Sequence, residues 1–373
     1  MTRHTRSTSF YTFATVLASI VAIALLCVVA EVGVRVRHYA KYGDFWGIED
    51  TYTTDAATGL RTPIPNGRFG GISINSLGFR GPEIAMPKPP HTTRIAFLGA
   101  STTYCAEVTN NEATWPDLVV RALGTRWQDA RLDYVNAGVP GFTVADSEVD
   151  LTARVAELEP DVVVIYHATN DLSQNSATLA REAGLLAAPT EQQLHWPAKY
   201  SLLWYLVEKN LRVIGQRDLE QSTNALSYDP ETLAIPFRRD LLSLVETSKR
   251  IAPDVVLMTF ATQLRREQAP DEQAKAAVTA RYYMPYMSVA GLVDGYESYN
   301  RVIRDVAATT GVQLIEAERE VPGDTAHFFD SVHLTDLGSK VLADRVTDGL
   351  ASSDTFIALL TARQAQLATG SGP

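Results

Sequence analysis

The sequence predicts an α/β fold: a parallel sheet of five strands, doubly wound in the flavodoxin-like manner with helices on both sides, preceded by one transmembrane helix. Two observations predict the sheet: short apolar runs alternate with segments of helical spacing, and the third of these runs is apolar on both faces. A third, a long uncharged stretch near the N-terminus, predicts the membrane helix. With 46% hydrophobic and 20% charged residues, the 373-residue composition excludes a disordered or collagen-like chain.

The uncharged stretch covers Phe10 to Ala30. At 1.5 Å per residue it is about 30 Å long, which matches the hydrocarbon core of a bilayer. A buried helix of a soluble protein would show a polar face, and this run shows none. A cleavable signal peptide is the alternative, because Val28-Val29-Ala30 is an acceptable cleavage site. The length of the run favours an uncleaved anchor, so we assign residues 1–41 to the anchor and its flanks.

The charge is unevenly distributed along the chain. Residues 1–41 carry five basic residues and one acidic residue, a net of +4, so the total of −10 leaves −14 for residues 42–373. A chain without a basic block is a poor partner for nucleic acid. Basic residues flank the apolar run on both sides, which does not favour export of the following domain. We still expect export, since long domains translocate largely regardless of flanking charge.

Residues 42–92 precede the predicted sheet and are rich in Gly, Pro, Asn and Thr. They contain one alternating stretch, residues 71–75, followed by a turn-like sequence. This pattern predicts a stalk with a small β element.

Only two cysteines are present in the whole sequence, which excludes a disulfide framework and a cysteine-rich metal site.

The main domain is predicted over residues 93–350. Its strands are expected at residues 94–98, 132–135, 161–166, 254–260 and 312–315, and its clearest helices near residues 115–120, 146–158 and 296–308. The third run is apolar on both faces, as in a parallel sheet covered by helices. The long connections predict insertions at about 174–235, which we expect to form a cap, and at about 262–293. Residues 351–373 are expected to form a C-terminal helix and a frayed tail.

Four peptides follow the predicted strands and should meet at one edge of the sheet, because ligands bind at the carboxyl ends of parallel strands. They are Gly-Ala-Ser-Thr-Thr (99–103), Asn-Ala-Gly-Val-Pro-Gly (136–141), His-Ala-Thr-Asn-Asp (167–171) and Asp-Ser-Val-His-Leu (330–334).

Their side chains have complementary chemistry. Ser101 lies on a glycine turn between a strand and a helix, which exposes its hydroxyl and its N–H. Asp330 is three residues from His333, so the carboxylate can orient an imidazole that takes the proton of Ser101. The backbone N–H of Gly141 and the amide of Asn170 can complete an oxyanion hole with the N–H of Ser101.

These four peptides resemble the motifs of the SGNH (GDSL-type) hydrolases over about residues 92–350. The resemblance implies a three-layer αβα sandwich, a Ser101–His333–Asp330 triad, and Gly141 and Asn170 as oxyanion donors, with no metal or cofactor. Two positions depart from the family pattern, Ala100 in place of Asp and Ala168 in place of Gly. The peptide containing Asn75, Gly78 and Arg80 is similar to membrane-anchored bacterial members. We therefore expect a single-pass protein of the bacterial cytoplasmic (inner) membrane, with an extracytoplasmic catalytic domain.

The predicted function is a serine esterase, lipase or deacetylase that acts on a small-molecule, glycan or lipid ester through an acyl-enzyme. Two alternatives remain open from the residues alone. One is an O-acyltransferase that passes the acyl group to a glycan hydroxyl, and the other is a catalytically idle surface or assembly protein of the same fold. Among the other histidines, only His167 is expected to approach the pocket. The aromatic run Tyr282–Tyr286 is either a sugar or acyl platform or helix packing.

Overall fold

The computed structural model describes residues 7–42, 51–186, 196–208, 210–211 and 225–369. The chain divides into two compact units. The first combines residues 1–50 with residues 191–215, and the second combines residues 51–190 with residues 216–373. The insertion after the third strand of the sheet therefore contributes to both units.

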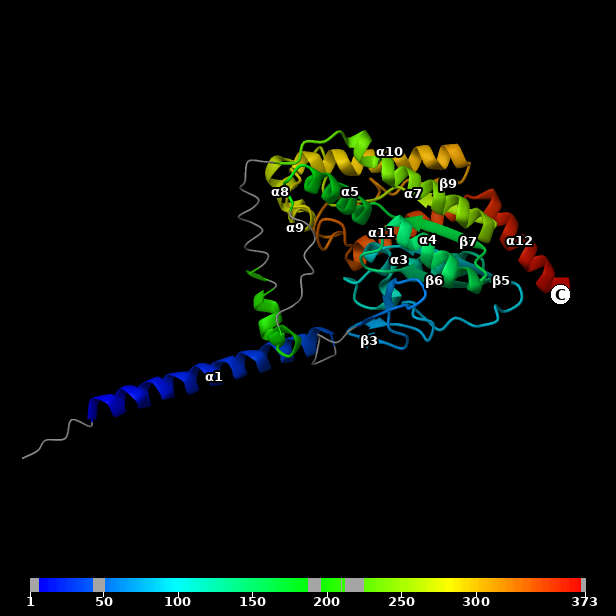
Figure 1. The fold of residues 1–373 in the computed structure, drawn as a ribbon. Coiled ribbons are helices and arrows are strands. Elements are labelled where there is room, and N and C mark those ends of the chain that lie inside the picture. The colour runs from blue at the N-terminus through cyan, green and yellow to red at the C-terminus, as the bar shows by residue number, and fades with distance from the viewer. Residues whose placement is uncertain (1–6, 43–50, 187–195, 209, 212–224, 370–373) are drawn as a thin grey trace, which may run out of the picture. The chain divides into compact units, whose positions relative to one another are not determined.

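The second unit is built on a five-stranded parallel sheet, which confirms the predicted fold class (Figure 1). The strands are β5 (Thr92–Gly99), β6 (Arg131–Gly138), β7 (Val162–Tyr166), β8 (Asp254–Met258) and β9 (Gln313–Ile315), in the order β6-β5-β7-β8-β9. Every residue of β5, β7 and β8 is buried. That burial explains why these strands read as apolar runs without alternation.

Helices flank the sheet in two groups (Figure 1). α3 (Trp115–Arg126) packs against α11 (Asp336–Ala351), while α7 (Pro230–Ile251) packs against α4 (Val144–Asp150), α5 (Thr169–Glu182) and α10 (Val289–Thr310). The remaining helices of this unit include α2 (Ser101–Tyr104), α8 (Pro270–Ala276), α9 (Val278–Tyr283) and α12 (Asp354–Thr369). The helix predicted near residues 146–158 is α4 continued by a π turn and a 3-10 turn. α12 extends to Thr369, within the region 351–373 predicted as a helix and a frayed tail, and residues 370–373 lie outside the described part.

Aromatic side chains fill the core beneath the carboxyl ends of the strands. The ring of Phe97 meets that of Trp115 edge-on at 5.0 Å, and the ring of Tyr166 stacks on Phe260 at 4.8 Å. The indole N–H of Trp115 donates to the carbonyl oxygen of Thr102 at 3.1 Å. The core thus contacts the backbone of α2 directly, and α2 begins at Ser101.

Residues 51–92 form two small antiparallel hairpins within the second unit. They are β1 (Tyr52–Thr54) with β2 (Arg61–Pro63), and β3 (Arg68–Phe69) with β4 (Ile72–Ser73). The alternating stretch at residues 71–75 forms only the short strand β4, because its partner β3 is two residues long. Beyond it, the guanidinium of Arg80 is buried and donates to the carbonyl oxygen of Tyr104 at 2.8 Å and to Asn111 Oδ1 at 2.9 Å.

The first unit contains α1 (Ser7–Tyr42) and a segment from the middle of the chain. Tyr11–Ala40 is long and apolar enough to cross a membrane, a property that anchors and signal sequences share. The helix continues beyond the predicted uncharged run through Glu31 and Arg35. Part of the predicted cap, residues 196–211, belongs with α1, while its ends form α5 and α7. Residues 187–195, 209 and 212–224 of that cap lie outside the described part.

Candidate active site

The register of the sheet brings the first three predicted peptides to one edge. Gly99 pairs with Gly138 on one side and with Tyr166 on the other, so β5, β6 and β7 end at the same level. The next two strands in the chain, β6 and β7, lie on opposite sides of β5. The connections therefore change direction at the carboxyl end of β5, and such a topological switch point is where α/β sheets bind ligands. Residues 330–334 reach the same edge from the loop before α11, since His333 contacts Ser101.

Two glycines allow α2 to pack closely on the strand ends. A Cβ at Gly138 would lie 2.4 Å from the backbone nitrogen of Tyr104, and a Cβ at Gly99 would lie 2.8 Å from the carbonyl oxygen of Tyr166. Any side chain at either position would push on backbone atoms. The glycines therefore set the position of Ser101, the first residue of α2.

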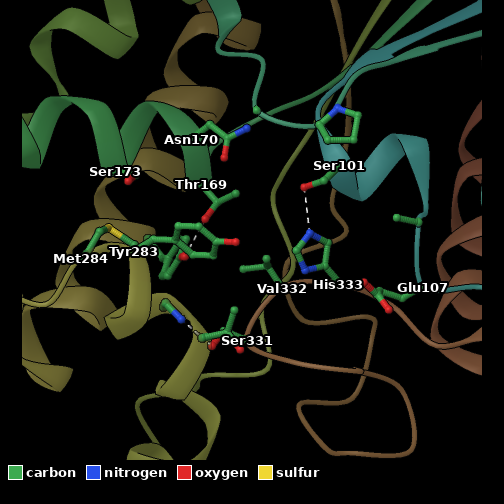
Figure 2. A pocket seen from close by; sticks show the side chains of 16 residues that line it. Ser101, Glu107, Thr169, Asn170, Ser173, Tyr283, Met284, Ser331, Val332 and His333 are labelled. Atoms are coloured by element: carbon green, nitrogen blue, oxygen red, sulfur yellow. Dashed lines mark hydrogen bonds between the residues drawn. The ribbon is translucent and has the colours of Figure 1, made fainter. Parts of the chain in front are cut away.

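A chain of hydrogen bonds joins Ser101, His333 and Asp330 (Figure 2). His333 Nε2 lies 2.8 Å from Ser101 Oγ, and His333 Nδ1 lies 2.8 Å from Asp330 Oδ2. Asp330 Oδ1 also accepts the backbone N–H groups of Val332 at 3.0 Å and His333 at 2.9 Å. These bonds hold the loop in a turn that places both side chains on the same side, as the spacing predicts.

The electrostatics of the pair favour a charged carboxylate beside a basic imidazole. Burial alone would lower the pKa of His333, but the hydrogen bond and charge of Asp330, with a smaller contribution from Glu107, raise it above its usual value. Burial alone would raise the pKa of Asp330, but the bonds donated by His333 and Val332 lower it. Such a carboxylate stabilises the imidazolium that forms when the serine is deprotonated.

The three candidate oxyanion donors line one cavity. Ser101, Gly141 and Asn170 all border a space of about 310 Å³. Gly141 has φ +94, a conformation that favours glycine, although a Cβ there would meet nothing within 4 Å. Asn170 Nδ2 donates to the carbonyl oxygen of Phe142 at 2.9 Å. Since the amide nitrogen carries two hydrogens, one remains for an oxyanion.

The cavity wall also includes Thr169 of the third peptide and residues from elements that no motif marked. Thr169 and Ser173 of α5 line the cavity together with Tyr283 and Met284, and Glu107 lies on the side of His333 (Figure 2). Tyr296 also lines the cavity. The hydroxyl groups of Thr169 and Tyr296 are 2.9 Å apart. In the aromatic run, Tyr283 borders the cavity, whereas Tyr286 is buried and bonded to the carbonyl oxygen of Ser173. Among these wall residues outside the four peptides, only Tyr283 was anticipated from the sequence, through the alternative that the aromatic run forms a sugar or acyl platform. No sequence pattern identified Glu107.

His167 does not line the cavity, so the expectation that it approaches the pocket is wrong. It is buried with Nε2 2.8 Å from Ser147 Oγ, and burial lowers its pKa to about 3.

Cys105 is also buried, and burial raises its pKa to about 11, which keeps the thiol protonated. Asp171 accepts the N–H of Val144 at 3.0 Å and so fixes the loop beside Asn170. Within the described ranges, no group of three His, Cys, Asp or Glu residues is arranged to hold a metal ion.

Both departures from the resembled motifs are buried alanines. Ala100 is 3% exposed and Ala168 is 2% exposed. Ala168 has φ −171, extended backbone that any residue adopts, so glycine is not required before Asn170. Neither alanine carries a group that takes part in the hydrogen bonds described above.

A five-stranded parallel sheet flanked by helices matches the fold of the SGNH-type hydrolases. The model of the GDSL-like lipase/acylhydrolase family matches residues 97–341, well over half of the chain, and the chain belongs to this family. The protein is accordingly a hydrolase that acts on ester bonds.

Three solved structures illustrate the similarity. The acetylxylan esterase Axe2 from Geobacillus stearothermophilus is 18% identical, with a TM-score of 0.42, and the match covers 70% of this chain and 95% of that chain. LAE5, described as an α/β hydrolase from the metagenome of Lake Arreo, Spain, is 17% identical, with a TM-score of 0.41 and coverages of 69% and 94%. A lipase/acylhydrolase from Enterococcus faecalis is 17% identical, with a TM-score of 0.41 and coverages of 69% and 95%. No curated protein matches the sequence.

Proposed function

We propose that the protein is a serine esterase that works through an acyl-enzyme. The observation that carries the proposal is the continuous hydrogen-bond chain from Ser101 through His333 to Asp330, opening on the cavity. Ser101 is the nucleophile, His333 the general base, and Asp330 the carboxylate that orients the imidazole.

The proposed reaction has two acyl-transfer steps. Ser101 Oγ attacks the ester carbonyl carbon while His333 Nε2 takes the hydroxyl proton, and the negative charge develops on the carbonyl oxygen. The N–H groups of Ser101, Gly141 and the Asn170 amide stabilise that charge. The alcohol leaves with the proton held by His333, and the Ser101 ester remains. Water, deprotonated by His333, then attacks that ester, and His333 returns the proton to Ser101 Oγ as the acid is released.

The proposed substrate is a small-molecule, glycan or lipid ester. The walls near Ser101 carry hydroxyl groups from Thr169 and Ser173 together with the apolar side chain of Met284. A series of p-nitrophenyl esters with increasing acyl length would define the size that this space accepts.

The test of the mechanism is an active-site label and a pair of substitutions. A fluorophosphonate should label the wild-type protein, because it reacts with an activated serine and an idle site would not activate one. It should not label Ser101→Ala, which lacks the hydroxyl group. Ser101→Ala and His333→Ala should each remove most esterase activity, and the double variant should be little worse, since the two residues act as one unit. Losses that multiply, or labelling that persists without Ser101, would overturn the assignment. Product analysis with a polysaccharide acceptor would reveal acyl transfer in place of hydrolysis.

We further propose that α1 is an uncleaved single-pass anchor in a bacterial cytoplasmic membrane, with the catalytic unit exported. A contact between α1 and the middle of the chain supports retention of the anchor. Glu31, directly after the candidate cleavage position, accepts hydrogen bonds from the N–H groups of Leu202 and Leu203 at 3.0 and 2.9 Å. N-terminal sequencing should find the intact chain, and alkaline phosphatase fused after residue 350 should be active. A cleaved N-terminus or a silent fusion would contradict the proposal.

A further inference from the structure

Residues 196–211, here called the aromatic segment, expose several large apolar side chains. Trp196 is 75% exposed, Tyr200 is 71% exposed and Trp204 is 49% exposed, and Val207 and Leu211 are exposed as well. Scattered apolar residues on a surface are ordinary, but two tryptophans and a tyrosine within nine residues form a concentrated patch. A surface of this kind requires something to cover it.

The aromatic segment is attached to α1 by a defined set of hydrogen bonds. Glu31 caps the N-terminus of the short helix at residues 202–208. Its carboxylate accepts hydrogen bonds from the N–H groups of Leu202 and Leu203 and, at 2.8 Å, from the hydroxyl of Ser201. Arg35 bonds Glu31 at 2.6 Å and donates to the carbonyl oxygen of Tyr200 at 3.0 Å. A carboxylate at a helix N-terminus satisfies N–H groups that lack partners within the helix.

The position of this attachment along α1 sets its depth in a membrane. Glu31 is the first charged residue after the 21 uncharged residues from Phe10 to Ala30. That run is about as long as the hydrocarbon core is thick, so residue 31 falls where the helix enters the headgroup region. Tryptophan and tyrosine concentrate at this level, because their rings are apolar and their N–H and O–H groups bond to water and headgroups.

We propose that the aromatic segment lies in the interfacial region of the bilayer that α1 spans, with Trp196, Tyr200 and Trp204 among the phospholipid headgroups. This inference rests on the proposed anchoring by α1, and it adds a second membrane contact from an insertion in the middle of the chain. The side chains are exposed in the protein because their partner is lipid. Glu31 and Arg35 hold the segment at the correct depth.

The test uses the full chain reconstituted in phosphatidylcholine vesicles that contain lipids brominated on the upper part of the acyl chain, which quench tryptophan fluorescence. The chain has five tryptophans. A variant with both Trp196→Phe and Trp204→Phe should lose a large part of the bromolipid-dependent quenching. Trp127→Phe is the matched control, because Trp127 packs against Phe356 in the second unit. It should lose none of that quenching.

Flotation of the same vesicles separates the two proposals. If wild-type protein floats with the vesicles but the double variant is quenched as strongly as wild type, the interfacial placement is wrong and the anchor stands. If wild-type protein does not float, the anchoring fails and the inference fails with it.

A second measurement tests the attachment itself. Glu31→Ala should accelerate hydrogen exchange at the N–H groups of Leu202 and Leu203, whereas Glu31→Gln, which keeps an acceptor oxygen, should accelerate it less. Unchanged exchange in Glu31→Ala would show that Glu31 does not hold the segment.

Discussion

Replacement of Gly138 by alanine should damage catalysis without removing any reactive group. The new Cβ would lie 2.4 Å from the backbone nitrogen of Tyr104 and 2.8 Å from the carbonyl carbon of Thr103. An ordinary contact begins at 3.4 Å, so α2 and the end of β6 must separate by about 1 Å. Both contacted atoms belong to the backbone of the helix that begins with Ser101, so no flexible side chain can absorb the change.

The size of the effect follows from this displacement. A misplacement of about 1 Å costs on the order of 10²-fold in rate, because the attacking atom leaves its near-attack position. Overpacking of this kind costs about 1–3 kcal/mol of the free energy of unfolding. We therefore expect Gly138→Ala to fold, with a lower melting temperature and a kcat for p-nitrophenyl acetate reduced by about 10²-fold.

The matched control is Gly124→Ala in α3, where a new Cβ meets nothing within 4 Å. Its kcat should stay at the wild-type value, and its free energy of unfolding should rise by up to about 1 kcal/mol, because alanine favours helix. Circular dichroism checks that both variants are folded. A folded Gly138→Ala enzyme with wild-type kcat would refute the argument that this backbone contact positions Ser101.

Three further predictions follow from individual contacts. Asn170→Ala should lower kcat by about 10²–10³-fold with little change in KM, because the oxyanion exists only in the transition state, and a folded variant with wild-type kcat would remove Asn170 from the site. Glu107→Gln should shift the acid limb of the kcat/KM profile to lower pH, since activity needs neutral His333 and Glu107 helps to raise the pKa of that imidazole; an unmoved limb would contradict this. Arg80→Ala should lower the free energy of unfolding by about 1–3 kcal/mol for each carbonyl left unbonded, measured by urea unfolding, whereas the exposed Arg68→Ala should not; equal losses would contradict the buried role.

The features predicted correctly from the sequence depend on local patterns. The strands are visible because a strand buried on both faces must be apolar throughout, as in the run ending at Tyr166. The loop at Asp330 and His333 is visible because two residues three positions apart can share one turn. The edge at which Ser101 lies follows from the shared direction of parallel strands. A single apolar run likewise sufficed to predict α1.

Tertiary structure alone decided the features that join distant segments. Thr169 and Tyr296 are hydrogen-bonded to each other in the cavity wall although 127 positions separate them, and no local pattern encodes such a pairing. His167 adjoins the site in sequence, yet its side chain turns toward Ser147 because the backbone direction after β7 determines which face it occupies. The exposed Trp204 of the insertion resembles part of an ordinary helix face until Glu31 of α1 is found at the N-terminus of its helix. The positions of the strands can be predicted from the hydrophobicity of consecutive residues. Cavity walls and helix caps depend instead on which distant segments the fold brings together.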